Sequence, residues 1–251
     1  MAEKEWWRTY FEENYLAFHK DRPFRDTQEE LELVQSVLGP ADGRSLLDAC
    51  CGQGRHAIPL CRLGWRVTGV DQSELMLEMA QREAEGLGRD NGGIEWVRAD
   101  LRRPMADSRF DAAICLFTSF GYCPEDSENQ KVLESIHRAL KSGGAFILDV
   151  ANRDFLIQHP YAIRNWWQRG EEYILEETKL SPVTSLATTR NVLVSTEGVR
   201  ESEYRIRLYS LHEIVRMMVE VGFEITSAYG NFPAEPIQMT SPRLILVAKK
   251  E

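Results

Sequence analysis

Hydrophobic and polar residues change their spacing several times along the chain, and each change predicts a different element. Residues 6–20 and 27–38 carry apolar side chains at helical spacing, which predicts two amphipathic helices. Thr27 and Glu30 form a capping-box pattern at the start of the second helix, and Gly39-Pro40 ends it. The chain is therefore expected to open with two helices before any strand.

From residue 45 onwards, short apolar runs alternate with helical patterns. The runs lack a strict polar–apolar alternation, which is typical of strands buried on both faces of a parallel sheet. The predicted strands span 45–50, 65–71, 93–98, 110–117 and 145–150, and the predicted helices between them span 55–63, 73–86 and 127–140.

The middle of the chain interrupts this rhythm. Residues 166–209 alternate polar and apolar side chains, with turn signals at Ser181-Pro182 and Glu197-Gly198, and this predicts an antiparallel meander. The strand–helix pattern then returns, with a predicted helix at 211–221 and predicted strands at 223–229 and 244–248. We therefore expect an α/β domain with an inserted antiparallel segment.

The composition of the chain argues against several kinds of binding partner. The 251-residue chain has a net charge of -9, so it gains no counterion-release attraction to nucleic acid. No apolar run approaches the roughly 20 residues that span a membrane, and the first residues lack the layout of a signal peptide. The five cysteines include no C-x-x-C pair. We expect a cytoplasmic protein with reduced thiols, no metal, and no nucleic-acid or membrane partner.

A glycine loop carries the first functional signal. Gly52-x-Gly54-x-x-Ala57 follows a predicted strand and opens a predicted helix, and Cys50 and Cys51 belong to the same loop. Glycines there let a ligand approach the backbone, and the helix start offers unpaired N–H groups. Asp71 ends the next strand, where a carboxylate binds a ribose diol. This pattern alone fits NAD as well as other nucleosides.

Two further carboxylates favour S-adenosylmethionine over NAD. Asp48 precedes the glycines, where it attracts the amino group of a methionine moiety and repels a pyrophosphate. Asp100 ends the third strand, where it can accept a hydrogen bond from an adenine amine while the Leu101 N–H meets a ring nitrogen.

With these residues in place, the chain resembles the class I S-adenosylmethionine-dependent methyltransferases. The resemblance covers roughly residues 44–150 and the last two strands. It rests on Asp48-x-x-Cys51-Gly52-x-Gly54, Gly69-Val70-Asp71-Gln72-Ser73-x-x-Met76, Arg98-Ala99-Asp100, Phe110-Asp111-Ala112-Ala113 and Leu140-Lys141-Ser142-Gly143-Gly144. It implies a Rossmann-like methyltransferase fold, with a mostly parallel seven-stranded sheet and helices on both faces. It also implies that Gln72, Met76, Asp100 and Leu101 surround the adenine, and that Leu116, Phe117 and Thr118 face the sulfonium.

Three other stretches resemble a bacterial subgroup of small-molecule methyltransferases. They are Leu116-Phe117-Thr118-Ser119-Phe120-Gly121-Tyr122, Asn152-Arg153-Asp154 and Ser241-Pro242-Arg243-Leu244-Ile245. In that subgroup an aromatic N-terminal helix covers the cofactor and the insertion after the fifth strand forms a lid. The resemblance implies that Tyr15, with the aromatic residues before it, belongs to the cofactor site.

Methyl transfer from a sulfonium is an in-line displacement that needs alignment more than side-chain chemistry. The chain shows no conspicuous catalytic triad, so the catalytic residues stay unknown; the acceptor-side candidates are Ser119, Tyr122, Arg153 and Tyr209. We expect methyl transfer to an O or N atom of a small metabolite, with S-adenosylhomocysteine as product. An NAD-dependent oxidoreductase and a non-catalytic S-adenosylmethionine-binding protein are the alternatives, and the first lacks a Tyr-x-x-x-Lys pair after the fourth strand.

The pattern also predicts how the chain is divided. Residues 1–43 would form helices that cover the cofactor site, residues 44–152 and 211–251 the cofactor-binding domain, and residues 153–210 the lid. A monomer or a homodimer is expected.

Overall fold

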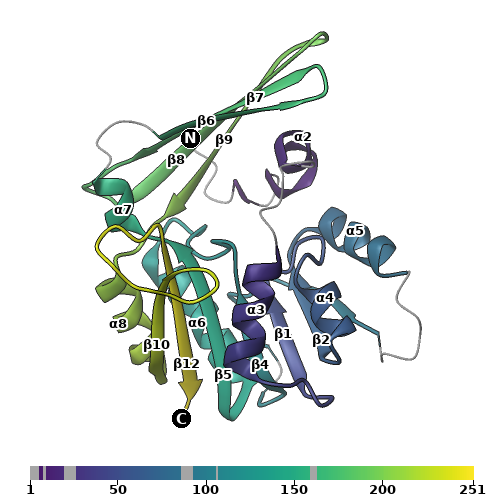
Figure 1. The fold of residues 1–251 in the computed structure, drawn as a ribbon, viewed down its shortest axis with the longest axis vertical. Helices are drawn as coiled ribbons and strands as arrows, with labels where there is room; N and C mark the ends of the chain where they lie inside the picture. The colour runs from purple at the N-terminus through teal and green to yellow at the C-terminus, as the bar shows by residue number, and fades with distance from the viewer. Residues whose placement is uncertain (1–5, 8–9, 20–26, 86–92, 106, 159–162) are drawn as a thin grey trace.

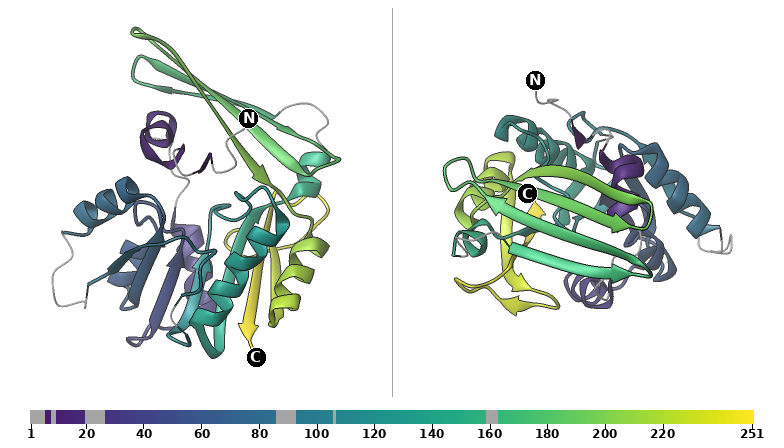
Figure 2. Two further views of the ribbon diagram at one scale, coloured as in Figure 1. Left: turned by 180° about the vertical axis from the view of Figure 1, so that it is seen from behind. Right: turned by 90° about the horizontal axis from the view of Figure 1, so that it is seen from above.

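The computed structural model describes residues 6–7, 10–19, 27–85, 93–105, 107–158 and 163–251 (Figure 1). A main sheet with helices on both faces forms the body, and a smaller antiparallel sheet stands beyond one end of it (Figures 1 and 2). The parts of the predicted segments 1–43, 73–86 and 153–210 that fall in the gaps lie outside the described residues.

The main sheet has eight strands in the order β11-β10-β12-β5-β4-β1-β2-β3. The five strands from β1 to β5 pair in parallel, and β12, β10 and β11 pair antiparallel. Seven of the strands confirm the predicted sheet, and β11 is an additional edge strand of only two residues. The bounds are Ser45–Ala49 (β1), Arg66–Asp71 (β2), Glu95–Arg98 (β3), Phe110–Cys115 (β4), Leu140–Ala151 (β5), Phe223–Asn231 (β10), Glu235–Pro236 (β11) and Arg243–Lys250 (β12).

Side-chain caps mark the starts of three helices, α5, α7 and α8. Ser73 accepts the Met76 N–H at the start of α5, and Ser210 forms a capping box with Glu213 at the start of α8. Gly222 ends α8 in the left-handed conformation. Among the described residues, no helix is both long and apolar enough to cross a membrane. The bounds are Tyr15–His19 (α2), Thr27–Leu38 (α3), Ala57–Arg62 (α4), Glu74–Ala84 (α5), Asp126–Ala139 (α6), Arg153–Ile157 (α7) and Leu211–Val221 (α8).

The N-terminal segment departs from the single helix that the periodicity predicts. A kinked stretch, η1 (Tyr10–Asn14), precedes α2, and Glu12 leaves the helical region with φ -102° and ψ -131°. The carbonyls of Trp7 and Phe11 accept hydrogen bonds from the side chains of Gln72 and Ser73. These tertiary bonds compete with helical ones, so the segment follows the surface beneath it.

The capping box predicted for α3 is replaced by a tertiary cluster. Thr27 Oγ1 accepts a hydrogen bond from Arg55 Nε at 3.1 Å, and Glu30 pairs with the guanidinium of Arg55 and with His56 Nε2. Glu30 is buried, so its carboxylate takes the two cationic or polar partners within reach rather than the exposed backbone of its own helix.

The predicted meander forms a separate four-stranded antiparallel sheet, the lid sheet, in the order β6-β7-β8-β9. It is inserted after β5, so it lies beyond the carboxyl ends of the parallel strands, with α2 between it and the body (Figure 1). A short helix that the sequence pattern did not predict, α7, leads into it. The bounds are Ile163–Arg169 (β6), Glu172–Leu180 (β7), Leu186–Ser195 (β8) and Gly198–Arg207 (β9).

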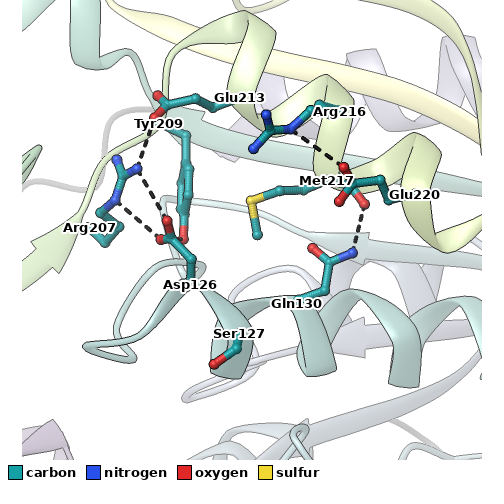
Figure 3. A pocket seen from close by; sticks show the side chains of 9 residues that line it. All are labelled: Asp126, Ser127, Gln130, Arg207, Tyr209, Glu213, Arg216, Met217 and Glu220. Atoms are coloured by element: carbon teal, nitrogen blue, oxygen red, sulfur yellow. Dashed lines mark hydrogen bonds and ion pairs between the residues drawn. The ribbon is translucent and has the colours of Figure 1, made fainter.

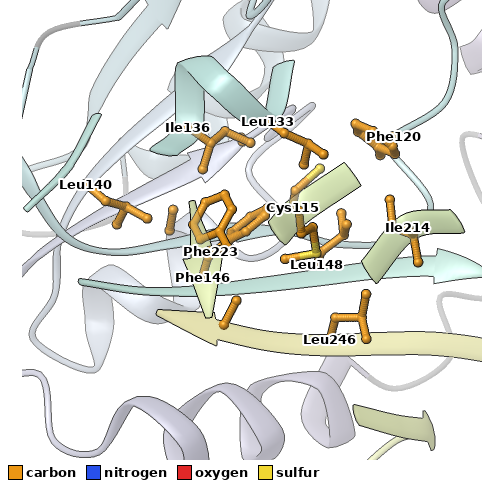
Figure 4. Close-up of a cluster of buried hydrophobic side chains, with 14 of the residues drawn as sticks. Cys115, Phe120, Leu133, Ile136, Leu140, Phe146, Leu148, Ile214, Phe223 and Leu246 are labelled. Atoms are coloured by element: carbon orange, nitrogen blue, oxygen red, sulfur yellow. The ribbon is translucent and has the colours of Figure 1, made fainter. Parts of the chain in front are cut away.

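Two apolar cores lie on opposite faces of the main sheet. Neighbouring strand residues alternate between them: Leu46 and Ile147 pack with α3 and α4, whereas Leu47 and Phe146 pack with α6 and α8. Figure 4 shows the second of these cores, which contains Phe146. Both faces being covered explains the continuous apolar runs in the sequence. The polar carboxyl edge of the sheet is therefore the place left for a site.

Candidate active site

The glycine loop leaves β1 through a series of left-handed residues. Cys50, Gly52 and Gly54 have φ values of 62°, 54° and 82°. A Cβ at Gly54 would lie 2.8 Å from the Trp96 ring, so this glycine is needed for packing beneath the loop. A Cβ at Gly52 would meet nothing within 4 Å. The loop thus packs closely on the protein side and leaves open space at Gly52.

Asp48 is buried in β1 directly below this loop, with 2% of its surface exposed. Its Oδ2 atom meets no hydrogen-bond partner among the described residues. Burial raises the pKa of its carboxyl to about 6, the Asp71 charge adds to this, and His56 and the Ala57 N–H oppose it. An orphaned buried carboxylate of this kind fits a cationic ligand group such as an ammonium.

Asp71 closes the same loop from the end of β2. Its Oδ2 accepts the Gly52 N–H at 2.9 Å and its Oδ1 accepts the Ser73 N–H at 2.9 Å. Burial raises the pKa of this carboxyl, and these backbone donors act against the shift. A carboxylate offers about four acceptor positions. Asp71 therefore shapes the loop and retains acceptor positions of the kind that a ribose diol needs.

The residues expected around an adenine follow the ends of β2 and β3 or lie in α5, and two of them have protein partners. Met76 and Leu101 are buried, and Gln72 reaches the carbonyl of Trp7 at 3.2 Å. The carboxylate of Asp100 binds the guanidinium of Arg102, with Nη2 to Oδ2 at 2.6 Å. The sequence pattern did not indicate this ion pair.

The loop after β4 crosses the carboxyl edge opposite the glycine loop. Phe117 and Thr118 both have left-handed backbones, with φ values of 61° and 59°, although neither is glycine. Phe117 is 38% exposed, and the guanidinium of Arg55 lies 4.4 Å from the centre of its ring. The hydroxyl of Ser119, a catalytic candidate, donates to the Leu116 carbonyl at 2.8 Å. This loop and the glycine loop therefore touch through Arg55 and Phe117.

Aromatic side chains fill the space between the N-terminal segment, this loop and the lid sheet. Tyr122 lies 5.1 Å from Phe11 and 5.8 Å from Trp6, and Tyr10 lies 5.2 Å from Tyr204 of β9, between ring centres. We call this the aromatic cluster; it comprises Trp6, Tyr10, Phe11, Tyr15, Tyr122 and Tyr204.

Polar groups of the lid sheet border the aromatic cluster. Asn191 is fully buried; its Nδ2 donates to the Tyr10 hydroxyl at 3.3 Å, and its Oδ1 has no hydrogen-bond partner among the described residues. Glu176 lies opposite Asn191 in the strand register and is also buried. Burial raises the pKa of the Tyr10 and Tyr122 hydroxyls, and Glu176 adds to the shift at Tyr10. No motif pointed to Asn191, Glu176 or Tyr204, because each is one of many polar or aromatic residues in alternating strands.

Two other catalytic candidates lie away from this space. Tyr209 is 1% exposed, and its hydroxyl donates to Asp126 Oδ1 at 2.8 Å and accepts from Asn129 at 2.9 Å. It borders a polar cavity of about 220 Å³ between α6 and α8, where Arg207 pairs with Asp126 and Glu213 (Figure 3).

Arg153, at the start of α7, pairs with Asp154 and Glu213. Of the four candidates, Ser119 and Tyr122 therefore lie in the loop beside the aromatic cluster, whereas Tyr209 and Arg153 belong to ion-pair networks at the base of the lid sheet.

Comparisons with known proteins found similar sequences and similar solved structures. A methyltransferase-domain family model matches residues 46–144. A glycine/sarcosine N-methyltransferase from Parasynechococcus marenigrum is 32% identical over 236 residues, which cover 89% of this chain and 80% of that protein.

Solved structures share the fold. The CcbJ methyltransferase from Streptomyces caelestis has a TM-score of 0.79 at 21% identity, with 90% of this chain and 89% of that one covered. CalS10 from Micromonospora echinaspora, an amino pentose methyltransferase with S-adenosylmethionine bound, has a TM-score of 0.67 at 17% identity, with 92% and 93% covered. The sequence match over most of both chains, on this fold, shows an enzyme whose cofactor is S-adenosylmethionine, and the chain belongs to the class I S-adenosylmethionine-dependent methyltransferases.

Proposed function

We propose that, of the O and N atoms expected as methyl acceptors in a small metabolite, the chain methylates the nitrogen of an amine held beside the aromatic cluster. The observation that carries the proposal is the set of aromatic rings and buried polar groups enclosed by the N-terminal segment, the loop after β4 and the lid sheet.

The residues around the glycine loop fit the cofactor. When bound, S-adenosylmethionine supplies a methyl group on a cationic sulfonium and leaves as S-adenosylhomocysteine. The orphaned Oδ2 of Asp48 would hold its ammonium group, and Asp71 would accept from its ribose hydroxyls. The open side of Gly52 gives its backbone access to the ligand. We place the other predicted contacts in the same site: Cys50, Cys51, Gly54, Gln72, Met76, Asp100, Leu101, Leu116, Phe117, Thr118 and Tyr15.

The aromatic cluster favours an acceptor that becomes cationic. In methyl transfer to a neutral amine, positive charge appears on the nitrogen as the new bond forms. Aromatic faces attract such a charge by about 0.5–2 kcal/mol, more when water is excluded. The carboxylate of Glu176 and the carbonyl Oδ1 of Asn191 add negative potential from the lid sheet.

The acid–base properties of the site point the same way. A hydroxyl acceptor must lose its proton as it reacts, whereas a neutral amine already offers a lone pair. Tyr10 and Tyr122 have hydroxyls whose pKa is raised by burial, so they stay protonated near neutral pH and are poor bases. His56 is held by Glu30 beneath the glycine loop. Once it is neutral, an amine therefore needs less from this site than an alcohol does.

The relatives support a nitrogen acceptor. The Parasynechococcus protein is named a glycine/sarcosine N-methyltransferase, and CalS10 is described as an amino pentose methyltransferase. We further propose that the N-terminal residues 1–43 and the lid of residues 153–210 enclose the acceptor, that the partner is a small molecule rather than nucleic acid, and that the enzyme acts in the cytoplasm as a monomer or homodimer.

Labelled methyl transfer tests the proposal. The protein is incubated with methyl-labelled S-adenosylmethionine and matched amine and hydroxy compounds, such as amino sugars and glycine against the corresponding sugars and glycolate. We expect label in an amine. Because a desolvated cation–π contact contributes about 2 kcal/mol, Tyr204→Leu should lower kcat/KM for that amine by roughly 30-fold.

Two comparisons decide the outcome. Tyr173→Leu, on the exposed face of the lid sheet, is the matched control and should leave kcat/KM within about twofold, because its ring lies outside the aromatic cluster. Label found only in hydroxy compounds, or equal effects of the two substitutions, would contradict an amine acceptor.

A further inference from the structure

The two left-handed residues after β4 require an explanation, because each carries a side chain that disfavours this conformation. Phe117 and Thr118 are consecutive, with φ values of 61° and 59°, and threonine is β-branched. Glycine adopts such a backbone without steric cost, but neither position has one. Something in the surrounding structure must hold this turn.

Asp149 of β5 binds both residues of the turn. The Phe117 N–H donates to its Oδ2 at 2.8 Å, and the Thr118 N–H donates to its main-chain carbonyl at 3.0 Å. The side chain of Asp149 is fully buried. A single residue of the neighbouring strand therefore sets the direction of both N–H groups.

Arg243, the first residue of β12, completes the arrangement. Its Nε donates to Asp149 Oδ1 at 2.6 Å and its Nη2 to Oδ2 at 2.5 Å, a bidentate ion pair. Nη2 also donates to the hydroxyl of Thr118 at 3.3 Å. Arg243 thus orients the carboxylate and contacts the turn directly.

Sheet stability alone does not account for this ion pair. β5 and β12 already pair over seven residues, from Arg243 opposite Ala151 to Lys249 opposite Ala145. Burying a charge pair costs desolvation, and apolar residues of similar volume often serve a fold as well. What the pair adds is a fixed position for the turn.

The turn lies where this position matters. Arg55, the residue after Gly54 of the glycine loop, stacks over the Phe117 ring. The turn also leads into Ser119 and Tyr122, which border the aromatic cluster. It therefore lies between the cofactor loop and the acceptor side.

We propose that the Arg243–Asp149 ion pair is a positioning device for methyl transfer, which holds the left-handed Phe117–Thr118 turn against the bound cofactor. This inference rests on the proposed placement of residues 116–118 beside the sulfonium. Neither Arg243 nor Asp149 needs to contact the cofactor or the acceptor. Their effect is transmitted through the backbone of the turn.

A glycine rescue tests the proposal. Arg243→Gln removes the guanidinium, and we expect it to weaken S-adenosylhomocysteine binding at least fivefold in calorimetry and to speed amide hydrogen exchange at Phe117 at least tenfold. Thr118→Gly in the Arg243→Gln background removes the side chain that makes a left-handed backbone unfavourable at this position. It should recover at least half of the lost affinity on a logarithmic scale without restoring the melting temperature.

Further variants separate positioning from folding. Arg243→Lys keeps the charge but loses the bidentate geometry, so its affinity should lie between those of wild type and Arg243→Gln. Arg138→Gln, which breaks the exposed pair with Asp107, is the matched control and should not change binding. Loss of affinity that Thr118→Gly fails to recover, or recovery only together with the melting temperature, would overturn the proposal.

The binding and exchange measurements need no acceptor, so they remain valid if the amine proposal fails. If an amine acceptor is found, kcat should fall at least tenfold in Arg243→Gln, with a smaller change in the KM of the amine, and should rise again with Thr118→Gly. An equal loss of kcat in Arg243→Lys and Arg243→Gln with unchanged hydrogen exchange would contradict a role in holding the turn.

Discussion

The position of Asp48 destabilises the ionised form of its carboxyl group. It is buried beneath the glycine loop with one oxygen unpartnered among the described residues, and Asp71 adds a second negative charge nearby. His56 and the Ala57 N–H offset only part of this cost, because the pKa of Asp48 remains raised to about 6. A cationic ligand group would remove the penalty, so the same residue that weakens the ligand-free protein should strengthen the complex.

The opposite effects of Asp48 on the ligand-free protein and on the complex predict two opposite pH dependences. If the ionised form of Asp48 binds the ligand ammonium, affinity for S-adenosylhomocysteine should rise as pH increases from 5 to 7, by up to about tenfold per unit below pH 6, and then level off. In the ligand-free protein the sign is reversed. Because folding raises the pKa of the Asp48 carboxyl, the ligand-free protein becomes less stable as pH increases from 3.8 to about 6.

Asp48→Asn is the variant that checks both signs. It should weaken S-adenosylhomocysteine binding in calorimetry, abolish the pH dependence between 5 and 7, and raise the melting temperature of the ligand-free protein at pH 7. Affinity that stays independent of pH in the wild-type protein would show that the ionised carboxylate does not hold the ligand.

At the scale of elements, the lid sheet is joined to the body at the end of β9. The Arg207 N–H donates to the Gly121 carbonyl at 2.8 Å, and a Cβ at Gly121 would lie only 2.3 Å from the Arg207 carbonyl oxygen. The loop after β4 and the lid sheet therefore touch through their backbones. Beside this contact, Tyr209 is bonded to Asp126 and Asn129 at the start of α6.

Tyr209→Phe distinguishes anchoring from catalysis. Loss of the hydroxyl removes two hydrogen bonds, one to a carboxylate, so we expect the free energy of unfolding to fall by about 1–3 kcal/mol. We expect kcat to change less than about threefold, because the hydroxyl faces α6 rather than the aromatic cluster.

Urea denaturation and steady-state kinetics measure the two effects, with the exposed Tyr173→Phe as control. A fall in kcat of several orders of magnitude with unchanged stability would restore Tyr209 as a catalytic residue.

At the scale of the molecule, the site is assembled from parts of the chain that are far apart in sequence. The N-terminal segment binds Gln72 and Ser73, just before α5, and packs against the lid sheet through Tyr10 and Tyr204. It therefore connects the predicted cofactor site with the proposed acceptor site. A ligand that fills the space under this segment should stabilise the whole chain.

Thermal unfolding measures this coupling. At 100 times its dissociation constant, S-adenosylhomocysteine should stabilise the protein by about 2.7 kcal/mol, which raises the melting temperature by roughly 5–10 °C for a chain of this size. NAD at the same concentration should produce no shift, because its pyrophosphate would meet the carboxylate of Asp48. Stabilisation by NAD alone would be incompatible with the assigned cofactor.

Much of the α/β body follows from local sequence. The apolar runs of β1, β2, β4, β5 and β12 predict buried strands, because both faces of the sheet are covered. The alternation of polar and apolar side chains in β6–β9 predicts an antiparallel sheet. Ser73 caps α5 and Gly222 ends α8 as their residue types predict. The cofactor followed from the order of Asp48, the glycines, Asp71 and Asp100 along the chain, because open α/β sheets bind ligands at the carboxyl ends of their strands.

Tertiary structure decided the rest. The N-terminal helix breaks at Glu12 because carbonyls of the segment bind side chains just before α5, and Glu30 binds Arg55 and His56 instead of capping its own helix. Asn191 in the lid sheet meets Tyr10 across 181 residues, and Arg243 reaches Asp149 across 94. Periodicity and local propensity report only which face of an element is buried, whereas the partner of a buried polar group depends on which distant element packs there. The sequence by itself therefore determined the sheet and the methyl donor, and only the folded chain brought together the residues that we propose surround the acceptor.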